Sequence, residues 1–213
     1  MEQYEKLCFF NGSLYIVCQI DPDMVNLVEY LKISPRDKLS FHCKLEIVRK
    51  IVGIMESVNG KTGGSQSHGH LTPNNILISK DGSRVQICDF GYTFLKKYCG
   101  FLSGYCNKNQ FSSPEVLEQR GLVVLDSTEK DDIYSLALIM WFLFEEQIPF
   151  EHMKLDIIKK YILVEKVRPK ISENMNNTLA IMLRVCWQYN PENRPSFKEM
   201  KDCLDNMKKI EFS

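Results

Sequence analysis

The chain has 213 residues with 27 basic and 27 acidic side chains, so its formal net charge is zero at pH 7. A balanced charge gives no electrostatic footprint for nucleic acid or for an anionic membrane, and we expect neither as a partner. The hydrophobic content of 44% suffices for one sizeable core, and we expect a single domain over residues 1–213.

Two short runs rich in β-forming residues begin the chain, at residues 8–10 and 14–18, with Asn-Gly-Ser between them. Such a pattern predicts a two-stranded hairpin. A connecting segment over residues 19–23 and a short helix over residues 25–31 are expected to follow.

A long amphipathic helix is predicted for residues 39–58. Its apolar positions recur at helical spacing over about five turns: Ile47, Val48, Ile51, Val52, Met55 and Val58. The segments 76–78 and 85–88 then flank Lys-Asp-Gly-Ser, which is typical of a β-hairpin with an Asp-Gly turn.

The longest apolar run covers residues 133–144. At about twelve residues it is too short to span a bilayer, and being apolar on all sides it predicts a buried helix. Further helices are expected over residues 152–164, 178–189 and 196–208. The expected fold class is therefore α+β, mainly α-helical.

Two motifs lie between these elements. Residues 68–75 have the sequence His-Gly-His-Leu-Thr-Pro-Asn-Asn, and residues 88–91 have the sequence Cys-Asp-Phe-Gly. The pair resembles the catalytic loop of protein kinases, His-Arg-Asp-Leu-x-x-x-Asn, and the Asp-Phe-Gly that follows it. The activation segment of a kinase would then include residues 92–112 and end at Ser113-Pro114-Glu115, which is similar to Ala-Pro-Glu.

The resemblance implies roles for individual residues. Asn75 and Asp89 match the two magnesium ligands, while His70 occupies the position of the catalytic base. Gly69 replaces the Arg of the loop, and Thr72 occupies the position of a Lys that steadies the transferred group. We therefore expect no catalytic residue and no cofactor, except that Asn75 and Asp89 could hold magnesium together with ATP.

Four residues farther along match the C-terminal lobe of a kinase. Asp132 is expected to brace the backbone of the catalytic loop, and Arg194 to form an ion pair with Glu115. Trp187 has the form seen in tyrosine kinases and the tyrosine-kinase-like group. The implied fold is a kinase C-lobe with only the last two N-lobe strands, residues 1–23 being these strands and the hinge and residues 24–213 the C-lobe.

The Gly-rich loop and strand Lys of kinases have no expected counterpart, so the implied function is that of a pseudokinase and not of an enzyme. It would act by binding a protein partner, such as a signalling kinase for which it is a decoy or regulator. Similarity to the mixed-lineage kinase domain-like group includes residues 148–151.

Two alternatives stay open. The chain could be a fragment, or a record started at the wrong Met, of a full-length kinase that binds ATP, or it could be an active kinase of unusual sequence. The eight cysteines contain no Cys-x-x-Cys pair, and no secretory signal pattern is recognised. These features favour a reducing compartment, and we expect a cytoplasmic protein.

Overall fold

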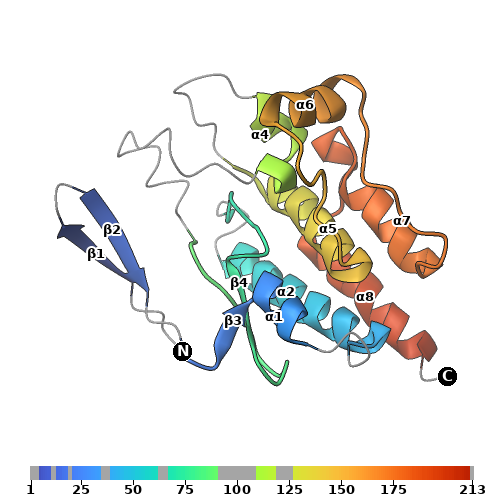
Figure 1. Ribbon diagram of the computed structural model, residues 1–213. Coiled ribbons are helices and arrows are strands. Elements are labelled where there is room, and N and C mark those ends of the chain that lie inside the picture. Colours follow the sequence, from blue (N-terminus) through green and yellow to red (C-terminus); the bar gives the residue numbers. More distant parts are fainter. Residues whose placement is uncertain are drawn as a thin grey trace.

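The computed structural model describes residues 5–10, 13–18, 21–34, 39–61, 67–90, 109–118 and 127–211. Most of the expected activation segment, residues 92–108, lies outside these ranges, as do residues 19–20 of the expected hinge. The two strands at the start of the chain are β1 (Glu5–Phe10) and β2 (Ser13–Cys18), which pair antiparallel and confirm the expected hairpin. Figure 1 shows this hairpin to one side of the helices.

A second, antiparallel sheet has the strand order β3-β4-β5. Its strands are β3 (Met24–Asn26), β4 (Ile76–Ser79) and β5 (Val85–Ile87). The β4-β5 hairpin was expected. Strand β3 was not, because residues 25–31 were predicted to be helical throughout. The helix found there, α1 (Leu27–Ile33), begins only at Leu27. Asn26 explains the later start, since its extended backbone is that of an N-cap and its side chain accepts a hydrogen bond from the backbone N of Glu29.

The core is built around one central helix (Figure 1). Among the described residues the four longest helices are α2 (Phe41–Lys61), α5 (Glu129–Glu145), α7 (Asn177–Cys186) and α8 (Phe197–Glu211). Every residue of α5 from Asp131 to Leu143 is buried, which confirms the buried helix. Helices α2 and α7 pack against α5, and α8 packs against α2.

The shorter helices are α4 (Pro114–Glu118), α6 (Leu155–Lys159), the 3-10 turns η2 (Asn109–Phe111) and η4 (Pro191–Asn193), and the π-helical turn η3 (Lys160–Val164). The helix expected over residues 152–164 was wrong at its start. Phe150 and His152 have φ values of 55° and 62°, a left-handed backbone that cannot belong to a right-handed helix, so α6 begins three residues later than predicted.

The class expected from the sequence, mainly helical with small antiparallel sheets, is confirmed. Its assignment to one lobe of a kinase stays a prediction at this point. Within the ranges given above, none of the helices is both long enough and apolar enough to cross a membrane.

Candidate functional site

One buried carboxylate fixes the loop of residues 67–75 to the start of α5. Asp132, which is 1% exposed, accepts hydrogen bonds from the backbone N of His68 at 2.6 Å and of Gly69 at 2.8 Å. Burial raises the pKa of Asp132 to about 7, and the two backbone donors act in the opposite direction. Gly69 has a φ of 73°, which glycine adopts without steric cost. The expected bracing role of Asp132 is confirmed.

His68 links this loop to the second motif. Its Nε2 lies 2.8 Å from the carbonyl of Cys88, and its Nδ1 accepts a hydrogen bond from the backbone N of His70. This arrangement assigns the ring proton to Nε2. The ring also packs edge-on against Phe90, with centroids 4.7 Å apart. Burial lowers the pKa of His68 to about 4, so the imidazole is neutral and its two hydrogen bonds persist at neutral pH.

Asn75 uses its side chain inside the same loop. Its Oδ1 accepts a hydrogen bond from the backbone N of Thr72 at 2.8 Å, and its Nδ2 donates to the carbonyl of His70 at 2.6 Å. The backbone carbonyl of Asn75 accepts from the N of Cys88 at 2.9 Å. The loop and the Asp-Phe-Gly segment are therefore joined at two points, through Asn75 and through His68. Oδ1 of Asn75 keeps a second lone pair, although the residue is only 2% exposed.

Asp89 contrasts with these well-bonded residues. Its φ is 67°, an uncommon conformation for a residue other than glycine. The side chain is partly buried, and burial raises the pKa of its carboxyl group. Over the described part of the chain, no hydrogen bond or ion pair compensates this carboxylate. Such a group suits a cation that is bound together with a ligand.

The base position and the lysine position lie on the anchored loop. His70 is partly exposed, and its backbone is held on both sides, by His68 and by Asn75. Thr72 is 4% exposed and brings no charge. The predicted residues His70, Thr72 and Asn75 therefore lie on one loop, and Asp89 lies in the segment that is joined to it.

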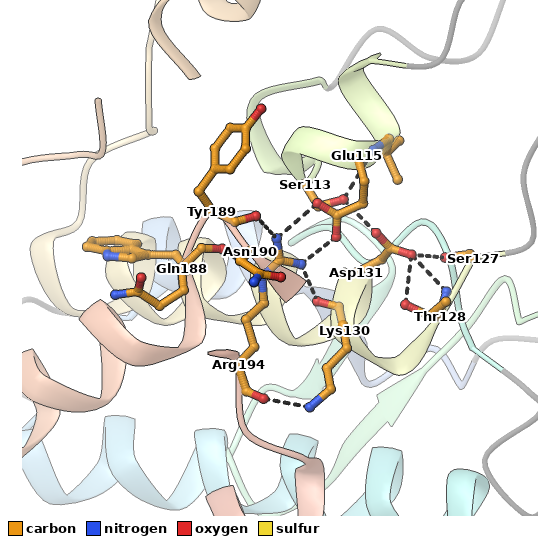
Figure 2. Close-up of polar contacts among 12 residues, drawn as sticks. Ser113, Glu115, Ser127, Thr128, Lys130, Asp131, Gln188, Tyr189, Asn190 and Arg194 are labelled. Atoms are coloured by element: carbon orange, nitrogen blue, oxygen red, sulfur yellow. Dashed lines mark hydrogen bonds and ion pairs between the residues drawn. The ribbon is translucent and has the colours of Figure 1, made fainter. Parts of the chain in front are cut away.

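The second predicted contact, between Arg194 and Glu115, is also present (Figure 2). The Arg194 side chain is completely buried, and it forms a bidentate pair in which Nη2 lies 2.9 Å from Oε2 and Nη1 contacts Oε1. Burial raises the pKa of Glu115, and Arg194 opposes that shift. The remaining donors of Arg194 reach the backbone carbonyls of Lys130, Gln188 and Tyr189.

The first turn of α5 connects these regions. Besides Asp132, the carboxylate of Glu129 accepts from the backbone N of Phe197 at 2.8 Å, and Nζ of Lys130 donates to the carbonyls of Arg194 and Pro195. The remaining residue of the turn, Asp131, was not identified from the sequence. The Thr-x-x-Asp spacing of residues 128–131, which is typical of a helix start, is the signal that could have found it.

Comparison with known proteins gives a family match over most of the chain. Residues 3–204 match the model described as protein tyrosine and serine/threonine kinase. The chain is 29% identical over 199 residues to the dual specificity protein kinase shkD of Dictyostelium discoideum, covering 91% of this chain and 25% of that protein. It is 28% identical over 181 residues to the serine/threonine/tyrosine-protein kinase HT1 of Arabidopsis thaliana, covering 84% of this chain and 44% of that protein.

A third relative is the serine/threonine-protein kinase CTR1 of Arabidopsis thaliana, 32% identical over 137 residues, with 64% of this chain and 16% of that protein covered. The HT1 and CTR1 kinases are relatives of the tyrosine-kinase-like kind that Trp187 indicated. The chain thus spans less than half the length of these three relatives.

These matches correct one expectation. The prediction that the chain is not an enzyme is wrong, because the matching family is one of kinases and the relatives carry the names of kinases. Gly69 and His70, which replace the Arg and Asp of the kinase loop, therefore do not separate the chain from that family. The alternative of a kinase fragment agrees better with the matches than the inactive domain does.

Proposed function

The chain belongs to the protein tyrosine and serine/threonine kinase family, and from that premise we propose that it forms the catalytic-loop part of a protein kinase. The reaction is transfer of the γ-phosphoryl group of magnesium-ATP to a hydroxyl group of a protein. The observation that carries the proposal is the anchored loop. Asp132 fixes its backbone, and His68 and Asn75 join it to the segment of Asp89.

The donors present fit a magnesium ion held together with phosphate. Asp89 offers a carboxylate that burial has destabilised, and Asn75 offers an amide oxygen with one lone pair unused by the loop. Two protein oxygens are few for a cation that prefers six, so phosphate oxygens would complete its shell. Asp89 and Asn75 would hold the magnesium, which would supply neutralisation of the charge that develops on the phosphate.

His70 takes the role of proton acceptor in this proposal. A neutral imidazole can accept the proton of the attacking hydroxyl at physiological pH. The hydrogen bonds on both sides of its backbone fix the place from which the side chain extends. General-base assistance is typically worth about 10²- to 10⁴-fold in rate, so the exchange of Asp for His changes the rate without removing the reaction class.

Thr72 affects the rate of the proposed reaction because it brings no charge to the transferred group. Where kinases often place a cationic side chain, this residue is neutral, and its backbone N is bound to Asn75. Charge neutralisation at the transferred group then falls to magnesium and to groups other than Thr72. We therefore expect slower transfer than in a kinase with Asp and Lys at positions 70 and 72.

We also propose how the chain divides between the two lobes of a kinase. Residues 1–23 would supply strands and the hinge of the N-lobe, and residues 24–213 the C-lobe. Because the chain spans only part of its relatives, the activity of the whole protein, its substrates and its partners are proposed in the same way. The partner we propose is a protein, either the phosphate acceptor or another signalling kinase, in the cytoplasm.

The test is a radiolabelled phosphate-transfer assay with a general protein acceptor, magnesium and ATP. We expect slow transfer that falls about 100-fold in His70→Ala, because the substitution removes the proton acceptor but none of the backbone bonds of the loop. The matched control is His152→Ala, an exposed histidine outside the loop. Absence of transfer by the parent chain, or equal transfer by the parent and His70→Ala, would overturn the proposal.

A further inference from the structure

The first turn of α5 holds a buried carboxylate that the proposed reaction does not use. Asp131 is 6% exposed and lies next to the loop anchor Asp132. Its Oδ1 accepts a hydrogen bond from Oγ of Ser113 at 2.7 Å, and its Oδ2 accepts one from the backbone N of Thr128 at 2.7 Å (Figure 2). Each oxygen of this carboxylate therefore binds a different segment of the chain.

On the Oδ1 side, Ser113 controls the start of α4. Its hydroxyl group is buried and is used twice, because it donates to Asp131 and accepts from the backbone N of Val116. Its carbonyl accepts from the N of Leu117 at 3.0 Å. The kinase motif Ala-Pro-Glu has an alanine at this position, which can make no such side-chain bond. The helix that Ser113 caps carries Glu115, the partner of Arg194.

On the Oδ2 side, the contacts lead back to the catalytic loop. Thr128 follows Ser127, whose carbonyl accepts a hydrogen bond from Oγ of Ser67 at 2.7 Å. Ser67 directly precedes His68, the residue that binds Asp132 and Cys88. A continuous polar series therefore runs from the catalytic loop through Ser127 and Asp131 to Ser113.

We propose that Asp131 is a positioning residue that sets the end of the activation segment against the catalytic loop and so determines how well the protein acceptor binds. The inference rests on the proposed function, because an acceptor is needed for its kinetic consequence. The physical reason is that hydrogen bonds to an ionised group are stronger than those between neutral groups, and a buried donor left without its partner is costly.

The variants Asp131→Asn and Ser113→Ala test this position. Asparagine keeps the size of the side chain but has only one oxygen, so its amide group must face either Ser113 or the N–H of Thr128. We expect KM for the protein acceptor to rise about tenfold in each variant, as for loss of one charge-assisted hydrogen bond, while KM for ATP stays within twofold. The double variant should be less affected than the two single effects combined predict, because each substitution removes or weakens the bond between positions 131 and 113.

The control is Ser196→Ala at the start of α8. Ser196 also caps a helix, since its Oγ accepts from the N of Glu199 at 3.2 Å and donates to the carboxylate of the same residue at 2.8 Å. A merely structural effect of losing a helix cap would raise KM for the acceptor equally in Ser196→Ala and Ser113→Ala. That result, or a fall in kcat with no change in KM, would overturn the inference.

A second readout separates this inference from the proposed function. Amide hydrogen exchange at Val116 and Leu117 should become about tenfold faster in Asp131→Asn than in the parent, and should be unchanged in Ser196→Ala. If the parent transfers no phosphate while exchange accelerates as expected, the proposed function fails and the positioning of α4 by Asp131 stands. If exchange at α4 is the same in parent and variant, the positioning role is wrong whatever the transfer assay gives.

Discussion

The cluster around Arg194 and the loop around Asn75 both attach to the first turn of α5. They differ in whether their charged side chains have partners of opposite charge. The guanidinium of Arg194 is fully buried, with a bidentate carboxylate and three backbone carbonyls around it. It also stacks on the ring of Tyr134, 5.0 Å from the centroid. Asp89, beside the loop, is a partly buried carboxylate that no other described residue compensates.

The difference separates a buried ion whose partners stabilise the fold from a carboxylate that we propose binds a ligand. A buried ion contributes to a stable fold only when its partners replace the water it has lost, and Arg194 meets that condition. A partly buried carboxylate has lost some of its hydration, and without a compensating partner this loss reduces stability. Such groups are found at binding and catalytic sites. The two regions should therefore respond in opposite directions when their charges are removed.

The largest expected effect is on the Arg194 cluster. Arg194→Met removes the cation but keeps much of the side-chain volume, so Glu115 and three carbonyls lose their donor inside the protein. We expect the free energy of unfolding to fall by about 3–5 kcal/mol, as for other broken buried ion pairs. Urea denaturation followed by circular dichroism measures the change.

The matched control is Lys201→Met, which removes the cation of a partly exposed pair with Glu56 at 3.0 Å. Pairs of this kind are worth at most about 1 kcal/mol, because water and salt screen them. Equal losses in Lys201→Met and Arg194→Met would show that burial does not distinguish the two ion pairs.

The sequence predicted the parts of this comparison that depend on motif spacing. The ion pair of Arg194 with Glu115 and the bracing of the loop by Asp132 were both expected from residues far apart in the chain, and both are present. Helix α5 was predictable because it is apolar on all sides, and a helix with that pattern has to be buried.

Other features could not be predicted because they depend on backbone conformation or on pairing in space. The start of α6 is set by positive φ values at Phe150 and His152, where neither residue is a glycine that would signal them. Strand β3 has three residues and exists through its pairing with β4. The contact of Asp131 with Ser113 joins two polar residues whose types are common at many positions.

The next largest effect should come from Asp89→Asn, the opposite case to Arg194. The neutral amide removes the desolvation cost that raises the pKa of Asp89, so the free energy of unfolding should stay equal or increase. Phosphate transfer should nevertheless fall about 100-fold or more, because the proposed magnesium ligand is lost. The paired measurements are urea denaturation and the transfer assay.

Asp202→Asn, an exposed carboxylate on α8, is the control and should change neither quantity. A loss of stability in Asp89→Asn would contradict the contrast with Arg194, because it would mean that the charge of Asp89 is also stabilised by partners in the folded chain. Unchanged transfer would contradict its role as a ligand.

The smallest expected effect is on the pH dependence of stability. It comes from His68, which links the catalytic loop to the Asp-Phe-Gly segment. Burial depresses the pKa of His68 from its usual 6.5 to about 4, so the folded state favours the neutral ring. The stability that follows is fully present above pH 6.5 and is lost as the pH falls to about 4. Asp132 acts in the opposite direction, because its raised pKa of about 7 gives stability that is lost as the pH rises from 3.8 through 7.

The two groups oppose each other between pH 4 and 6.5, so their contributions to the stability of the parent chain should largely cancel in that window. His68→Gln keeps a donor for the carbonyl of Cys88 but cannot titrate, and it leaves Asp132 in place. Relative to the parent, this variant should therefore gain stability as the pH falls from 6.5 to 4, with a slope of at most about 1.4 kcal/mol per pH unit. Urea denaturation at half-unit pH steps measures the difference, and parallel profiles would mean that His68 accepts its proton equally well in the folded and unfolded chain.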